Sequence, residues 1–291
     1  AGVYAMAGLA DDWLESRQTC IDVLCAYLRM PYTPPPAQGS DSQSAVAGRE
    51  GRKQAEEATR YAREEREVRH TVIRLIGRHL RSTEEATNSW CGCDFDFTGA
   101  TFDGGDFSGA VFSGGRVSFE RAEFSGGRVS FERATFSEGE VFFGGARFSG
   151  GSVSFERTAF SGGRVSFGAA RFSGGRVFFN GARFSGGWVF FNLAKFSGAR
   201  MSFDGARFSG GWVSFERTAF SGGRMSFARA ALSGGWVSFE QTAFSGGEVS
   251  FGGAAFSGGR VSFDGAKLDV PPIFDRGSDG EFPPGVDLPE T

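Results

Sequence analysis

The stretch AEFSGGRVSFER, from Ala122 to Arg133, is one copy of a twelve-residue unit that decides the fold of this chain. Written generally, the unit is A-x-F-S-G-G-x-V-S-F-x-x, and variants of it fill the chain from Phe112 to Leu268. A unit this short cannot bury its own apolar face, so each copy must be covered by the next. The sequence therefore predicts a solenoid.

Two series of large apolar residues mark the expected interior. One runs from Phe112 to Leu268 and the other from Phe119 to Phe263, and each recurs once in every unit. Every member has a smaller residue two positions earlier, so the two side chains lie on the same side of an extended segment. A largely buried Phe contributes on the order of 2 to 3 kcal/mol, and a ladder of such rings offsets the ordering entropy of a Gly-rich chain.

Just upstream, the segment DFTGATFDGGDFSGAVF has a spacing of five between its Phe residues. This pattern resembles the pentapeptide-repeat family, whose units have a central Phe or Leu and a small residue two positions before it. The resemblance implies a right-handed quadrilateral parallel β-helix with four pentapeptides per coil. Later units carry two extra residues after each pair of pentapeptides, which favours a rectangular coil. The residues that match the central position are Phe97, Phe102, Phe107 and Phe112. The residues two positions before them are Phe95, Ala100, Gly105 and Ala110.

The residue after Gly-Gly indicates how many units form a coil. Trp occurs there in every second unit of one region, whereas the alternate units carry Arg or Glu. A coil of two units, about 24 residues, stacks the Trp side chains on one wall and the Arg side chains on the opposite wall. Seven to eight such coils, at about 4.8 Å each, would form a rod roughly 35 to 40 Å long. The residues concerned are Trp188, Trp212 and Trp236 in one set, and Arg176, Arg200, Arg224 and Glu248 in the other.

Two surface strips are therefore candidate interaction sites. Trp188, Trp212 and Trp236 form an exposed aromatic strip of the kind that marks contact sites, although stacked indoles also stabilise neighbouring coils without a partner. The second strip suits an anionic partner, and simple solubility is the alternative. It consists of Arg128, Arg176, Arg200 and Arg224.

Composition argues against most other functions. Residues 92–270 hold 18 Lys or Arg and 16 Asp or Glu, so the solenoid lacks the strongly basic face that direct nucleic-acid binding requires. Between Asp94 and Val270 there is no His, Cys or Tyr, which removes most catalytic constellations. The sequence predicts no enzyme activity and no cofactor.

The segments outside the solenoid have different compositions. Residues 1–30 are expected to form a helical hairpin, whose motifs G-x-Y-A-x-x-x-L-A and V-L-x-A-Y-L-R resemble the helical segment that precedes the repeats in many bacterial pentapeptide-repeat proteins. Residues 31–48 form a Pro/Gly/Ser linker. Residues 49–91 predict a charged helix that becomes amphipathic and is a candidate N-terminal cap for residues 92–270. The tail, residues 271–291, is acidic and rich in Pro, and Ile273 and Phe274 are expected to fold over the last coil.

The cysteines and the chain ends bear on location. Cys20, Cys25, Cys91 and Cys93 form no C-x-x-C motif, so we expect reduced thiols and a cytoplasmic protein. A zinc site from Cys91 and Cys93 with His70 or His79 is the less favoured alternative, because the usual ligand spacings are absent. No apolar run reaches the ~18 residues of a membrane span. The chain begins without Met, and a membrane tether in a preceding segment is an open alternative.

These observations favour a non-enzymatic scaffold that mediates protein–protein interaction. The alternative follows from the family resemblance, since some pentapeptide-repeat proteins mimic the shape and charge of B-form DNA and bind DNA gyrase. Such mimicry requires a strongly negative rod, whereas this one is near neutral.

Overall fold

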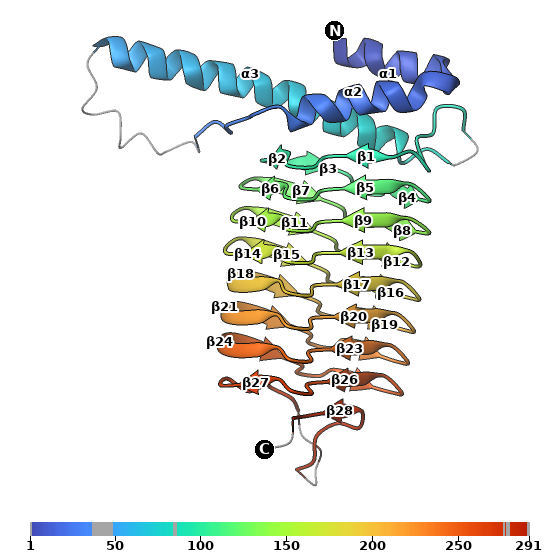
Figure 1. Cartoon of the computed structure of the whole chain (residues 1–291), viewed down its shortest axis with the longest axis vertical. Helices are drawn as coiled ribbons and strands as arrows, with labels where there is room; N and C mark the ends of the chain where they lie inside the picture. Colours follow the sequence, from blue (N-terminus) through green and yellow to red (C-terminus); the bar gives the residue numbers. More distant parts are fainter. Residues whose placement is uncertain (1, 37–48, 84–85, 276, 278–279, 290–291) are drawn as a thin grey trace.

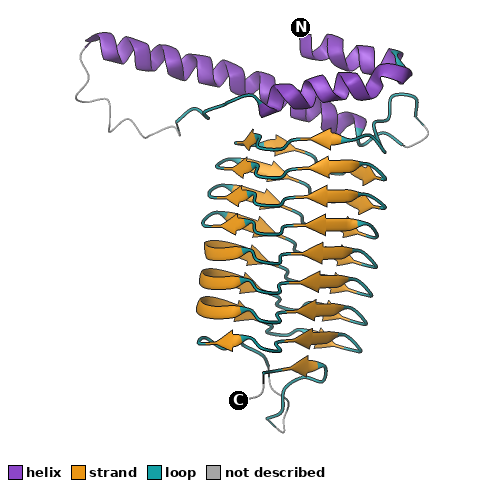
Figure 2. Ribbon diagram, viewed as in Figure 1, coloured by secondary structure: helices purple, strands orange, loops and turns teal. Residues whose placement is uncertain are grey.

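The solenoid of this chain is a stack of parallel coils below a group of helices (Figures 1 and 2). The computed structural model describes residues 2–36, 49–83, 86–275, 277 and 280–289. Each complete coil contributes up to four short strands, and within these described ranges the strands form three parallel sheets.

The first sheet has nine strands in the order β1-β5-β9-β13-β17-β20-β23-β26-β28 among the described residues. Their bounds are β1 Phe95–Asp96, β5 Arg116–Ser118, β9 Glu140–Phe142, β13 Arg164–Ser166, β17 Trp188–Phe190, β20 Trp212–Ser214, β23 Trp236–Ser238, β26 Arg260–Ser262 and β28 Val286–Asp287.

The second sheet has twelve strands among the described residues, because two legs of the coil join where β18, β21 and β24 run on through a corner. The strands of one leg are β2 Thr101–Phe102, β6 Glu123–Phe124, β10 Arg147–Phe148, β14 Arg171–Phe172 and β27 Lys267–Leu268. The strands of the other leg are β3 Gly105–Asp106, β7 Arg128–Ser130, β11 Ser152–Ser154 and β15 Arg176–Phe178. The strands that join the two legs are β18 Lys195–Ser202, β21 Ala219–Ser226 and β24 Ala243–Ser250.

The third sheet has seven strands in the described part of the chain. They are β4 Val111–Ser113, β8 Thr135–Ser137, β12 Ala159–Phe160, β16 Arg183–Phe184, β19 Arg207–Phe208, β22 Ala231–Leu232 and β25 Ala255–Phe256.

The pairing register confirms the coil of two units. Trp188 pairs with Trp212, and Phe148 pairs with Phe172, so each residue meets its equivalent two units further along the chain. The first coil is shorter, since Phe95 pairs with Val117 rather than with Phe119. The physical reason is that this coil begins with uninterrupted pentapeptides and has only one of the two-residue insertions.

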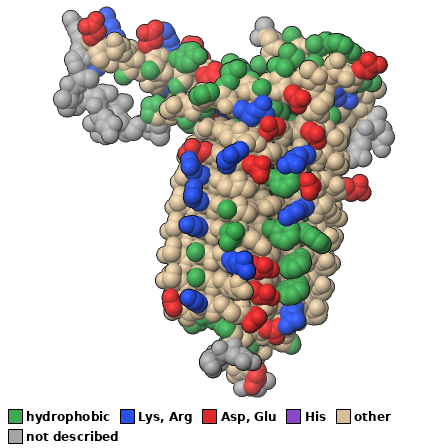
Figure 3. Space-filling model, in the orientation of Figure 1, with side chains coloured by type: hydrophobic (Ala, Val, Ile, Leu, Met, Phe, Trp, Pro, Cys, Tyr) green, Lys and Arg blue, Asp and Glu red, His purple; other side chains and the backbone are tan. Residues whose placement is uncertain are grey.

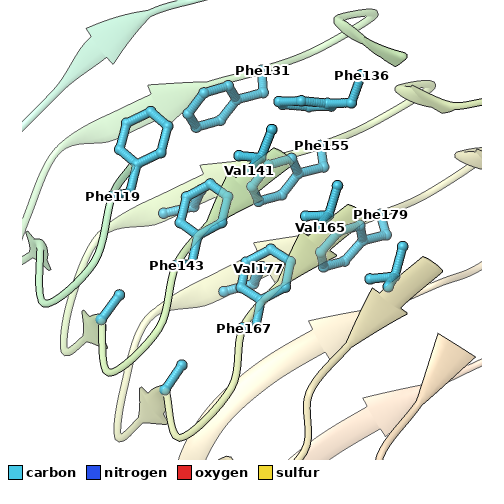
Figure 4. Close-up of a cluster of buried hydrophobic side chains, with 14 of the residues drawn as sticks. Phe119, Phe131, Phe136, Val141, Phe143, Phe155, Val165, Phe167, Val177 and Phe179 are labelled. Atoms are coloured by element: carbon cyan, nitrogen blue, oxygen red, sulfur yellow. The ribbon is translucent and has the colours of Figure 1, made fainter. Parts of the chain in front are cut away.

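The core is a continuous stack of Phe rings with Val and Ala beside them (Figure 4). Rings of successive coils stack nearly parallel, as for Phe143 and Phe167, whose centroids are 4.6 Å apart at an interplanar angle of 6°. Rings facing each other within one coil meet edge to face, as for Phe143 and Phe155 at 5.8 Å and 85°. These two geometries are the ones that aromatic pairs favour, so each coil templates the next.

Helices cover the N-terminal end of the solenoid. In the described part of the chain they are α1 Gly2–Asp12, the short 3₁₀ helix η1 Leu14–Ser16, α2 Arg17–Arg29 and α3 Arg49–His79. The Gln18 side chain and the Asp94 backbone exchange two hydrogen bonds of 2.9 and 3.0 Å, and the backbone N–H of Val111 donates to the Leu80 carbonyl at 2.8 Å. The helices and the residues that follow α3 therefore supply partners for the first coil.

Glycines in the first coil permit the close approach of α3. A Cβ on Gly105 would lie 3.0 Å from the Ile73 side chain, and one on Gly104 would lie 3.0 Å from the His70 ring. Both glycines also have positive φ, at 155° and 152°. The Asp-Gly-Gly-Asp run thus provides a surface without side chains on which the helix packs.

The ends differ in detail from the sequence expectation. Helix α3 ends at His79, and the described residues from 86 to 91 form turns and irregular backbone rather than more helix. Residues 37–48 of the expected linker lie outside the described residues. In the tail, Phe274 stacks on Phe251 with centroids 4.6 Å apart, and β28 adds a strand to β26 that the sequence did not predict.

Candidate interaction surfaces

The aromatic column, which we define as Trp188, Trp212 and Trp236, lies on adjacent strands of the nine-stranded sheet. The three residues are in direct register. The Trp212 and Trp236 rings stack at 5.2 Å, whereas Trp188 meets Trp212 edge to face at 6.3 Å. Trp188 is 54% exposed and Trp236 is 36% exposed. Figure 3 shows hydrophobic side chains gathered in a vertical run on this face of the rod.

The same column continues above and below with charged residues. Arg164 precedes Trp188 in register, and Arg260 follows Trp236. The Arg164 guanidinium lies 5.1 Å from the centroid of Phe190, and that of Arg260 lies 5.8 Å from Trp236. A cation–π contact thus lies at each end, on Trp236 of the column itself and on Phe190 beside Trp188.

The arginine column, defined as Arg128, Arg176, Arg200 and Arg224, lies on the twelve-stranded sheet. Its members are in register, with Ser152 between Arg128 and Arg176. All four are exposed. Arg224 pairs with Glu248 at 3.1 Å and Arg128 with Glu132 at 3.8 Å, so the column is partly neutralised at its ends.

A further basic column was missed at the sequence level. Arg147, Arg171 and Lys195 are in register on β10, β14 and β18, and all three are exposed. None forms an ion pair with a described residue. The sequence signal for this column is the residue directly after the small Ala of the unit. The basic residues become visible as a column when this position is compared between every second unit, because those units stack. A hollow of about 220 Å³ lies beside this column, lined by it and by Ser149, Ser173, Ser197, Ala219 and Ser221.

A groove of about 630 Å³ lies between α3 and the first coils, and Arg128 forms part of its wall. Asp103 is buried at its base and accepts hydrogen bonds from Tyr32 at 2.9 Å and His70 at 3.0 Å, with Arg66 Nε 2.9 Å away. Burial alone would raise the pKa of Asp103, but the hydrogen bonds from His70 and Tyr32 and the charges of His70 and Arg66 hold it below its usual value. This network ties α3 and the segment after α2 to the solenoid.

The residues considered for zinc lie in other networks. His79 stacks on Trp90 at 4.0 Å and contacts Asp11 at 3.0 Å, while Cys91 Sγ lies 3.5 Å from the Val111 carbonyl. Burial raises the pKa of the Cys25 thiol to about 12. No group of three or more His, Cys, Asp and Glu in the described ranges could hold a metal ion. Among the same residues, no helix is both long enough and apolar enough to span a bilayer.

The comparison with protein-family models agrees with the repeat pattern. Residues 94–135 match the family model of the pentapeptide repeats (9 copies). Two solved structures of trypsin-treated variants of QnrB1, a plasmid-mediated fluoroquinolone resistance protein, align at 19% and 20% identity. The alignments cover 61% and 68% of this chain and 84% and 85% of those chains, each with a TM-score of 0.29. No curated protein matches the chain.

The fold itself is established by the parallel strand pairing, which continues at two units per coil from the matched segment to Leu268. The family match falls on the coils in which the pentapeptides are uninterrupted and on their first neighbours. Residues 94–135 are therefore similar to the pentapeptide-repeat family, and the same coiled architecture continues beyond them, with a small helical region ahead of the repeats.

Proposed function

We propose that this chain is a non-enzymatic scaffold that binds a partner protein through the aromatic column. The observation that carries the proposal is an in-register column of indoles, exposed at Trp188 and Trp236 and half-buried at Trp212, on a rigid, continuously stacked rod. Large aromatic side chains held in place by a stiff support supply most of the energy at many protein interfaces.

The fold does not require indoles at these positions. The same column carries Arg116, Glu140, Arg164 and Arg260 in other coils, which pair in the same register. In addition, the buried Nε1 of Trp212 has no hydrogen-bond partner in the described part of the chain. Covering an unpaired donor costs about 1–3 kcal/mol, so this hydrogen-bonding group does not explain why Trp stands at this position.

The non-enzymatic part of the proposal rests on the residue types present. The solenoid from Asp94 to Val270 has no His, Cys or Tyr. Its recurrent Glu-Arg pairs lie at coil corners, where for example Glu132 contacts Arg128 and Arg133 at 3.8 and 4.0 Å. Exposed pairs of this kind serve solubility more than chemistry.

Affinity capture from lysate followed by mass spectrometry tests the proposal. Trp188→Arg, Trp212→Arg and Trp236→Arg are introduced together, because Arg already occupies this column elsewhere and the fold should be retained. The control replaces Arg176 and Arg200 by Ser, the residue that stands at Ser152 in their column. We expect a partner that the wild type and the control capture and the Trp variant does not. Identical capture by all three proteins would contradict the proposal.

DNA gyrase is the alternative partner that the family resemblance implies. A supercoiling assay on purified gyrase separates the two ideas. Inhibition by low micromolar wild type and equally by the Trp variant would replace the aromatic-column proposal with gyrase modulation.

A further inference from the structure

One face of the rod carries both the aromatic column and the basic column of Arg147, Arg171 and Lys195. Four residues, of which the middle two form a turn, connect β13 to β14, and four residues connect β17 to β18 in the same way. The two columns therefore run side by side along the coils. Figure 3 shows them together, with a row of Lys and Arg along one edge and the hydrophobic run on the other side of the same face.

Between the columns runs a central row, formed by the residue that follows each V-x-F Phe on this face. In the coils next to the basic column it consists of Gly144, Gly168 and Asn192, whereas the coils that follow carry Glu216 and Glu240. The row thus has no charged side chain at these three positions. It is acidic on both sides of them, with Glu120 in the coil before, whose carboxylate oxygen lies 3.4 Å from where a Cβ of Gly144 would be, and Glu216 in the coil after.

The backbone does not demand glycine in this row. Gly168 has ordinary φ, and a Cβ there would lie 3.4 Å from the nearest atom, the Ser166 Oγ. Gly144 likewise has room, with its nearest contact 3.4 Å away at the Glu120 side chain. The missing side chains leave an open strip beside Leu193, which is 57% exposed. The backbone geometry and the space around these positions therefore do not explain the choice of glycine.

We propose that this strip binds an acidic amphipathic helix of a partner protein, laid along the rod axis. This deepens the proposed function and rests on it. The three cations, which form no ion pair with a described residue, require a row of carboxylates. The adjacent stripe of the partner helix would carry apolar side chains, which pack against Leu193, Trp188 and Phe190.

The spacing favours a helix. Coils repeat about every 4.8 Å, and one helical turn advances about 5.4 Å. Carboxylates at i, i+4 and i+7 therefore stay within reach of three long basic side chains. The helix body, about 10 Å across, lies over the side-chain-free strip. The acidic central row beyond Asn192 repels the end of an acidic helix and so sets how far it extends.

A designed peptide tests the inference by fluorescence anisotropy. The probe is a helical peptide of about four turns with one stripe of Glu beside one stripe of Leu, compared with a scrambled peptide of the same composition. We expect the wild type to bind the striped peptide at least about tenfold more tightly than the scrambled one, and more weakly as salt rises.

The variant is Gly168→Glu, which installs the side chain that Glu216 and Glu240 carry at the same place. Its matched control is Gly252→Glu, which lies between β24 of the twelve-stranded sheet and β25 of the seven-stranded sheet, away from the strip. A Cβ also has room there, 3.6 Å from the Ser250 Oγ. We expect Gly168→Glu to weaken the striped peptide at least about tenfold and Gly252→Glu to leave it unchanged. Far-UV circular dichroism checks that both remain folded.

Several outcomes would overturn the inference. They are equal binding of striped and scrambled peptides, wild-type affinity in Gly168→Glu, and tighter binding of a single-stranded oligonucleotide than of the peptide. If the lysate partner depends on the aromatic column but survives Gly168→Glu, the proposed function stands and only the helical ligand is wrong.

Discussion

At the scale of single residues, the corners of the coil explain where the repeat tolerates variation. The second residue after each V-x-F Phe has a left-handed backbone, whether it is Gly or not. Arg229 has φ 56° and Gly205, at the equivalent position one coil earlier, has φ 65°. The sequence draws attention to the Gly-Gly corners, and these second corners were missed because most residues there are not Gly. The left-handed conformation costs a residue with a Cβ roughly 1–2 kcal/mol.

Exchanging residues at this corner should therefore change stability in opposite directions. We expect Arg229→Gly to raise the free energy of unfolding by about 1 kcal/mol, since it removes that cost. Gly205→Arg should lower it by a similar amount, because a Cβ at Gly205 meets no atom within 4 Å and only the backbone is strained. Urea unfolding measures both. A loss of stability in Arg229→Gly would show that its side-chain packing matters more than its φ.

Among the elements, the helices are held to the solenoid and to one another by polar side chains that serve as partners for backbone groups. The buried Arg69 of α3 donates to the carbonyls of Tyr27 and Leu28 at the end of α2, and its guanidinium lies 4.5 Å from the Tyr32 ring. Burial lowers the pKa of Arg69, and the nearby Glu65 offsets part of that effect. The side chain thus caps a helix that ends without a glycine.

Removing this cap should loosen the helices and spare the solenoid. We expect Arg69→Leu to cost about 3 kcal/mol or more, because two carbonyls lose their buried donor. Hydrogen exchange should rise over α2 and α3 and stay unchanged in the central coils. Arg74→Leu on the exposed side of α3 is the control and should change stability by at most about 0.5 kcal/mol. Equal protection in both variants would mean that apolar packing alone holds the helices.

The contact between α3 and the first coil should also depend on acid pH. Since the pKa of Asp103 is depressed in the folded protein, its contribution is complete above the ordinary Asp pKa of about 4 and is lost as the pH falls through the lower folded value. We therefore expect the helices to detach at acid pH before the coils unfold. Asp103→Asn should weaken their attachment at neutral pH and flatten the pH profile followed by hydrogen exchange. The exposed Asp106→Asn should leave the profile unchanged.

For the whole molecule, the period of the sequence predicts most of the architecture. The recurrence of Trp in every second unit was sufficient to predict the coil length and the placement of both predicted strips, because stacking in a solenoid is a nearest-neighbour property. The position of the helices was not predictable in the same way. It depends on single contacts, such as those of Asp103 and of Gly104 and Gly105, which have no period. The basic column could have been predicted in the same way as the column of Trp residues, by comparing the position after Ala between every second unit.

The same nearest-neighbour logic makes the effect of a core substitution depend on the coil that carries it. Phe167 is fully buried and stacks at 4.6 and 4.7 Å on the Phe rings of the coils before and after it. Phe256 is partly exposed and packs against Phe251 and Phe274 near the end of the rod. We expect Phe167→Ala to cost about 3–5 kcal/mol and to uncouple the two halves, so that unfolding in urea separates into two transitions.

Phe256→Ala should cost less than Phe167→Ala and increase hydrogen exchange only in the last coils, since the remaining coils keep all their neighbours. A single transition with the same loss in both variants would mean that the rod unfolds as one cooperative unit, with coupling that extends well beyond adjacent coils.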